Sequence, residues 1–135
     1  MLISVLRVRS PLLDVDKLLA SHPTVRPDAI WHIGEARDSH RTYSDSGFYL
    51  SLVDDDDRTW AVLVQQTFAE LDRLSPLLLD VQRAGSIPAV DYGVSVGTTE
   101  AFVRSCHFGA VELQRFVQLG VSVCVTAYPT RDDEP

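Results

Sequence analysis

The sequence contains little cysteine, since only Cys106 and Cys124 occur among 135 residues. Two thiols are too few for a disulfide scaffold, and a chain of this length can bury a core without disulfides or metals. No apolar run approaches the roughly 20 residues that span a bilayer, and the start of the chain lacks the basic region and apolar stretch of a signal peptide. The sequence therefore predicts a cytoplasmic protein with two buried free thiols.

Motifs for catalysis and for cofactors are also missing. The glycines never form G-x-G-x-x-G or a P-loop, which argues against a nucleotide cradle. The histidines and cysteines lack the close paired spacing of metal sites. Residues 93–97 match the G-x-S-x-G pattern of hydrolases, but Ser95 lies in an alternating strand pattern with no helix after it. We expect no catalytic residue, no cofactor, no metal and no enzymatic activity.

Positive charge is in deficit, because 12 Lys and Arg face 19 Asp and Glu for a net charge of −7. Such a field repels nucleic acid and attracts a basic protein partner. The strongest local feature is the aspartate run Asp54, Asp55, Asp56 and Asp57. This run is typical of a solvated loop before a helix, and a contact for a basic partner is the alternative.

Hydrophobic periodicity predicts the secondary structure of the first half. Strands are expected over 2–8, 29–33 and 47–53, with a polar loop over 35–46. Asp14 or Asp16 can cap a short helix that reaches residue 20, and Asp57 or Thr59 can cap a longer one. The longer helix has an apolar stripe formed by Trp60, Leu63, Val64, Thr67, Phe68 and Leu71.

In the second half, Ser75 and Pro76 either kink the long helix or start a new one with Ser75 as its cap, which continues to Gly85. Strands are expected over 90–97 and 121–128, and a further strand over 102–108. A helix over 110–119 ends at Gly120, which suits a left-handed cap.

This order of elements predicts an α+β fold with a mostly antiparallel sheet and helices packed on one face. The first six elements follow the order of a ferredoxin-like βαββαβ core, to which a C-terminal helix and strand are added. We expect one domain over residues 1–129 and a flexible acidic tail over 130–135.

Short strings along the chain resemble one bacterial family. They are residues 30–35 (Ile-Trp-His-Ile-Gly-Glu), the strand over 47–52 and the ending over 113–128. The chain resembles the domain-of-unknown-function family numbered 4279, in which Trp31, Gly34 and Glu35 match a Trp-x-x-Gly-acid signature. The resemblance implies a compact α+β protein with no established activity, and the aspartate run departs from the family pattern.

The first functional hypothesis is a non-enzymatic, immunity-type inhibitor that occludes a basic partner such as a bacterial toxin. Its predicted contacts are Trp31, Glu35 and Tyr43, because aromatics concentrate at binding hot spots, together with Asp54, Asp55, Asp56 and Asp57. A second hypothesis is a small-ligand binder or enzyme with a pocket on the sheet face, using His32, Glu35 and His107 as acid and base. A third is a subunit that self-associates as a homo-oligomer.

Overall fold

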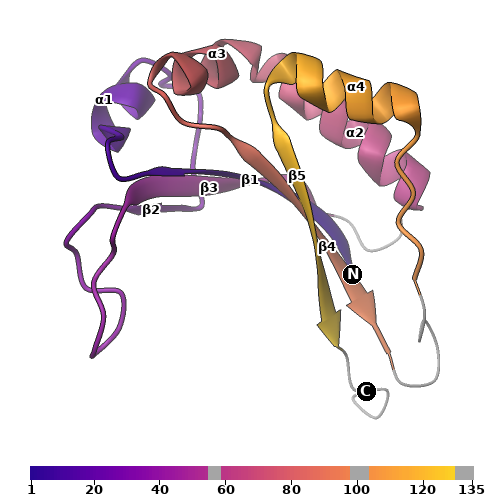
Figure 1. The fold of residues 1–135 in the computed structure, drawn as a ribbon, viewed down its shortest axis with the longest axis horizontal. Coiled ribbons are helices and arrows are strands. Elements are labelled where there is room, and N and C mark those ends of the chain that lie inside the picture. Colours follow the sequence, from indigo (N-terminus) through magenta and orange to yellow (C-terminus); the bar gives the residue numbers. More distant parts are fainter. Residues whose placement is uncertain (55–58, 98–103, 130–135) are drawn as a thin grey trace.

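The computed structural model describes residues 1–54, 59–97 and 104–129, and it contains one five-stranded sheet. In chain order the elements are β1 (Leu2–Ser10), α1 (Val15–Ala20), β2 (Ala29–Trp31), β3 (Ser46–Asp54), α2 (Trp60–Arg73), α3 (Ser75–Arg83), β4 (Ala89–Val96), α4 (Ala110–Leu119) and β5 (Ser122–Pro129). The strand order across the sheet is β2-β3-β1-β4-β5 (Figure 1).

The central strand β1 pairs antiparallel with both β3 and β4. Strand β2 pairs antiparallel with β3, whereas β5 runs parallel to β4. The predicted α+β class with a mostly antiparallel sheet is therefore confirmed. The elements also follow one another in the predicted order, with α2 and α3 together in the place of the second helix, while the ferredoxin-like classification stays a prediction.

All four helices lie on one side of the sheet (Figure 1). Side chains alternate between the two faces of a strand, so every second residue of β1 points toward the helices. Leu6 and Val8 are fully buried there, while Arg7 and Arg9 between and beyond them are exposed. The core between sheet and helices is completed by residues from β3, β4 and the helices, including Phe48, Leu63, Leu71, Leu77, Val81, Val90 and Tyr92.

Local capping chemistry sets the helix ends largely as predicted. Asp14 accepts a hydrogen bond from the backbone N–H of Lys17 at 3.1 Å, and Thr59 caps α2. Gly120 ends α4 in the left-handed conformation with φ 68°. The expected cap at Ser75 is wrong: the chain does start a new helix, but its N-cap is Leu74, because the Ser75 hydroxyl donates back to Asp72 O at 2.7 Å.

Three further predictions need correction. Strand β2 stops at Trp31, because the backbone turns into a loop before residue 33. Residues 104–109 form no strand, and the rest of the strand expected over 102–108 lies outside the described residues, as does the tail over 130–135. The thiols are not buried, since Cys106 is half-buried and Cys124 is exposed on the edge strand. No helix in the described ranges is long and apolar enough to cross a membrane.

Candidate functional site

The sheet face opposite the helices carries two arginines side by side on β1. Because successive side chains alternate, Arg7 and Arg9 share this open face. The strand register places Tyr49 of β3 beside Arg7, and Gly47 beside Arg9. Trp31 of β2 lies on the far side of Gly47 in the same row. Two cations and two aromatic side chains are thereby brought together from three strands.

A folded connection between β2 and β3, residues 32–45, forms one wall of this region; we call it the β2–β3 arm. In Figure 1 it extends from the edge of the sheet toward the side away from the helices. Gly34 turns the chain with φ 87°, and its N–H donates to Tyr43 O at 2.9 Å. The Tyr43 N–H donates back to Glu35 O at 2.9 Å, so a two-stranded base holds the arm. This order was missed in the sequence, where the segment reads as a polar loop.

The tip of the arm is fixed by Asp38. One carboxylate oxygen, Oδ1, accepts hydrogen bonds from the backbone N–H groups of His40 and Arg41, each at 2.8 Å. The other oxygen accepts from the Arg41 side chain at 2.9 Å. These donors, the His40 N–H first among them, lower the pKa of Asp38 below its ordinary value, because they favour the ionised carboxylate.

Trp31 and Tyr43 form a stacked pair where the arm meets the sheet. Their ring centroids lie 5.8 Å apart at an interplanar angle of 23°. The indole N–H of Trp31 donates to Asp45 Oδ1 at 2.9 Å. The Trp31 ring also covers Gly47, where an added Cβ would lie only 2.7 Å from Trp31 Cζ2. The ring is therefore held by the sheet below it, by Asp45 at its edge and by Tyr43 on its face.

Between these groups lies a cavity of about 330 Å³. Its lining comes from β1, β2, β3 and the arm and consists of Arg7, Arg9, Ala29, Ile30, Trp31, Arg37, Thr42, Tyr43, Ser44, Asp45 and Tyr49. Three guanidinium groups thus face one carboxylate, in a chain whose net charge is −7. The lining of the cavity is therefore positively charged, whereas the whole chain is negatively charged.

The three arginines of the cavity are not equivalent. Arg7 lies 5.4 Å above the ring centroid of Tyr49, and its Nε is 3.5 Å from Asp91 Oδ2. Asp91 is itself held from β5 by the Thr126 hydroxyl, which donates at 2.8 Å. Arg9 and Arg37, in contrast, have no carboxylate within 4.0 Å in the part of the chain that the structure describes. Within the described residues Arg9 thus has no ion-pair partner, and Arg37 has only the longer-range attraction of Asp38.

Comparisons with known proteins do not identify the chain. No family model, no curated protein and no solved structure gives a significant match. The resemblance to family 4279 accordingly stays a prediction, and every functional statement rests on the geometry of the chain itself.

The predicted partner-binding residues are only partly brought together. Trp31 and Tyr43 stack, and Glu35 lies in the same arm. Asp54 lies at the opposite end of β3, seven positions beyond Gly47 and therefore roughly 23 Å from it at about 3.3 Å per residue. Asp55, Asp56 and Asp57 lie outside the described residues. The aromatic pair and Asp54 thus belong to separate surfaces.

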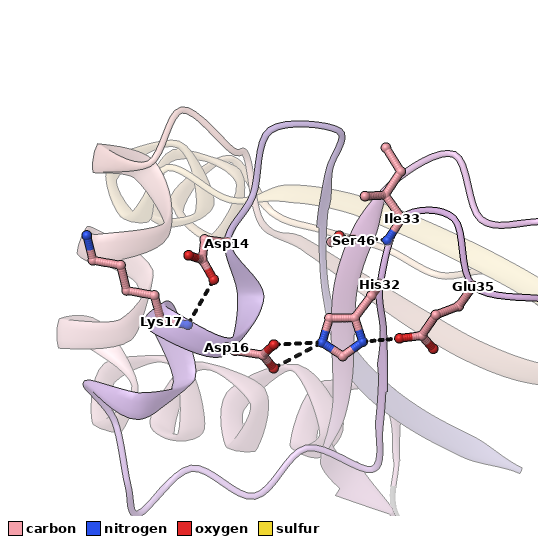
Figure 2. Close-up of polar contacts among 7 residues, drawn as sticks. All are labelled: Asp14, Asp16, Lys17, His32, Ile33, Glu35 and Ser46. Atoms are coloured by element: carbon pink, nitrogen blue, oxygen red, sulfur yellow. Dashed lines mark hydrogen bonds and ion pairs between the residues drawn. The ribbon is translucent and has the colours of Figure 1, made fainter.

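Of the three acid and base groups considered for an enzyme, His32 and Glu35 lie together, and Asp16 joins them. Figure 2 shows the His32 ring between two carboxylates, with Nε2 2.9 Å from Asp16 Oδ2 and Nδ1 facing Glu35. Hydrogen bonds to Asp16 first and then Glu35 raise the pKa of His32 above its ordinary 6.5. His107 does not join them, since it lies before α4, where its carbonyl accepts from the Trp60 indole.

The G-x-S-x-G match and the metal-capable side chains can also be located in the structure. Ser95 of the G-x-S-x-G match lies within β4, and its hydroxyl accepts a hydrogen bond from the Met1 amino group at 2.6 Å. Both ring nitrogens of His32 are engaged by carboxylates, which leaves no free lone pair once the ring is protonated. Among the described residues, no group of three His, Cys, Asp or Glu side chains is arranged to hold a metal ion.

Proposed function

We propose that the protein binds a small organic anion in the cavity on the open sheet face. The observation that carries this proposal is the placement of Arg7, Arg9 and Arg37 around one cavity, with no carboxylate within 4.0 Å of Arg9 or Arg37 among the described residues. Like charges held close together cost free energy unless an anion compensates them. Guanidinium groups suit this task because their planar donors match carboxylate and phosphate oxygens.

The dimensions and the construction of the cavity support the same role. Its volume of about 330 Å³ falls in the range of small-molecule sites, which are typically about 300–1,000 Å³. Its floor is a paired sheet and its wall is an arm held by backbone hydrogen bonds at its base and by Asp38 at its tip, so the charged groups are presented on a pre-formed frame. A frame of this kind lowers the ordering cost of binding.

Isothermal titration calorimetry with inorganic phosphate and cyclohexanecarboxylate tests this proposal. We expect both anions to bind at low salt and Arg9→Gln to weaken binding at least tenfold, since a charge-assisted hydrogen bond contributes about 1.5–3 kcal/mol. Arg26→Gln is the matched control, because it removes one exposed positive charge outside the cavity lining. Equal affinities for the two variants, or no binding of either anion at millimolar concentration, would contradict the proposal.

A protein-binding role of the inhibitor type is the second candidate. Beside the Trp31 and Tyr43 pair, Ile30 and Ile33 are about half exposed, with exposed fractions of 45% and 53%. Aliphatic side chains next to an aromatic pair and the exposed Glu35 suit a partner with an apolar centre and basic rim. The expected cytoplasmic location and the absence of catalysis belong to this candidate as predictions.

Affinity capture from native cells tests the inhibitor candidate. The variant Ile33→Asp places a charge at one of these aliphatic positions, whereas Leu12→Asp changes another exposed aliphatic side chain, with an exposed fraction of 90%, between β1 and α1. A single basic partner that is retained by Leu12→Asp, lost with Ile33→Asp and released at high salt would support an inhibitor. A partner that both variants retain equally would place the contact elsewhere.

A further inference from the structure

The cavity that we propose as an anion site is lined on its uncharged side by aromatic rings. Trp31, Tyr43 and Tyr49 contribute to the lining from β2, the arm and β3 respectively. The aliphatic part of the lining is small, consisting of Ala29 and Ile30. A saturated ligand gains only contact area from such rings, whereas an aromatic ligand also gains a stacking or edge interaction.

The aromatic groups are held in place before any ligand binds. Trp31 is fixed by its hydrogen bond to Asp45 and by its contact with Gly47. Tyr43 is fixed by stacking on Trp31 and by two backbone hydrogen bonds within the arm. Rings that do not need to be ordered on binding lose little entropy. The aromatic part of the lining is therefore ordered before a ligand binds.

Arg9 and Arg37 line the same cavity as these rings. Arg9 and Trp31 occupy the same row of the sheet, one on each side of Gly47, so about two strand spacings, roughly 10 Å, separate their backbones. Because the Trp31 ring extends over Gly47, the gap between ring and guanidinium is shorter than the gap between backbones. Arg37 lies 6.0 Å from the ring centroid of Tyr43. A ligand of one ring and one acidic group spans this arrangement.

From this arrangement, and resting on the proposed anion site, we infer that the ligand is a small aromatic anion, a planar ring that carries a carboxylate or phosphate group. Its acidic group binds Arg9 and Arg37, and its ring lies against Trp31 and Tyr43. A cationic ring is disfavoured because three arginines outnumber the single carboxylate, Asp45, in the lining. Long polyanions such as nucleic acids are disfavoured by the net charge of −7 that the whole chain carries.

Calorimetry with matched pairs of probes tests the inference on the full chain. Benzoate is compared with cyclohexanecarboxylate, and phenyl phosphate with inorganic phosphate, so that within the first pair only the aromatic character of the ring changes. We expect benzoate to bind about three- to tenfold more tightly than cyclohexanecarboxylate, the size of one aromatic pair interaction. The tighter binder of benzoate and phenyl phosphate then identifies the acidic group.

Variants at Tyr43 separate the ring effect from the charge effect. Tyr43→Leu should weaken the preference for benzoate and leave cyclohexanecarboxylate binding within about twofold, whereas Tyr43→Phe should keep the full preference, because it retains the ring. In a Trp60→Phe variant Trp31 is the sole tryptophan, so benzoate should change its fluorescence in step with the calorimetric curve.

Three results would overturn the inference, and they differ in whether the proposed anion site is contradicted as well. Equal binding of benzoate and cyclohexanecarboxylate removes the aromatic ligand but keeps the anion site. A preference for benzoate that is undiminished in Tyr43→Leu places the ring elsewhere. Failure of all four probes to bind removes both the aromatic ligand and the proposed anion function.

Discussion

Tyr92 is the largest fully buried side chain of the core, and its ring packs against Trp60 and Phe108 at centroid distances of 5.0 and 5.5 Å. Its hydroxyl makes no hydrogen bond of normal geometry within the described ranges. Burial raises the pKa of Tyr92 to about 12, although the nearby Thr67 hydroxyl opposes that rise. Thr67 itself donates to Leu63 O at 2.7 Å, so it gives the phenol little compensation.

We expect Tyr92→Phe to change the free energy of unfolding by less than about 1 kcal/mol at pH 7, since an unpaired buried hydroxyl contributes little. The raised pKa gives stability that is complete below pH 10 and is lost as the pH rises from 10 toward about 12. The variant should therefore lose less stability than the wild type over that interval. Urea unfolding at pH 7, 10 and 11.5 measures this, with Tyr128→Phe, which is partly exposed on β5, as control.

His32 provides a second titration, this time on the surface. Since Asp16 and Glu35 raise its pKa, the stability that its charge contributes is complete below pH 6.5 and is lost as the pH rises through the raised pKa. Asp16→Asn should lower the pKa of His32 more than Glu35→Gln does, because Asp16 is the larger cause. Histidine NMR titration measures both shifts. Asp14→Asn is the control, since Asp14 caps α1 without touching the ring (Figure 2); an equal shift there would contradict the assignment.

Residue types alone could have revealed part of the cavity. Arg7 and Arg9 stand two positions apart in a strand that was predicted, and a period of two places both on one face. The apolar residues of this strand, however, occupy both of its faces, so its pattern does not single out the face that carries the arginines. Their neighbours Trp31, Arg37 and Tyr49 come from distant parts of the chain, and only the pairing of β1, β2 and β3 brings them together. No spacing in the sequence encodes that pairing.

Among the elements, those with long apolar patterns were predicted best. The stripe from Trp60 to Leu71 gave α2, and alternation gave β4 and β5, because burial against a single core enforces these periods. The β2–β3 arm has no apolar pattern and was therefore not recognised. It is ordered by backbone pairing and by one carboxylate, Asp38, and such local hydrogen bonds leave no periodic trace.

The arm supplies a prediction of its own. Asp38→Ala removes the acceptor for two backbone N–H groups, so the amides of His40 and Arg41 should exchange with solvent faster, while Asp38→Asn should retain part of the protection. Because the pKa of Asp38 is lowered, this protection should persist below the ordinary pKa of 3.8 and be lost as the pH falls through the lowered value. Hydrogen exchange measured by NMR tests this. Unchanged amides in Asp38→Ala would show that other contacts hold the tip.

At the scale of the whole molecule, a chain with a net charge of −7 contains a cavity lined by three arginines and one aspartate. Several exposed ion pairs neutralise charge locally, among them Arg41 with Asp38, Arg73 with Glu70 and Arg83 with Asp80, all three residues apart. Such exposed pairs contribute little to stability, because water and salt screen them. The sheet ends at β5, which pairs with no further strand in the described ranges and could pair with a second copy of the chain. The net charge of −7 makes two copies repel each other, and self-association stays a prediction.

The unbalanced charge predicts how stability depends on salt. At pH 7 the excess acidic groups repel one another. Salt screens this repulsion, and the stability gained should exceed the stability lost when salt also weakens the surface ion pairs. Calorimetric melting should show a rise of about 2–5 °C in the melting temperature between roughly 0.02 and 0.3 M NaCl. Near pH 4.9, where the net charge vanishes, the rise should disappear. A rise caused by chloride in the cavity would be lost in Arg9→Gln, whereas a rise caused by the overall charge would remain. A melting temperature that falls with salt at pH 7 would mean that the ion pairs dominate.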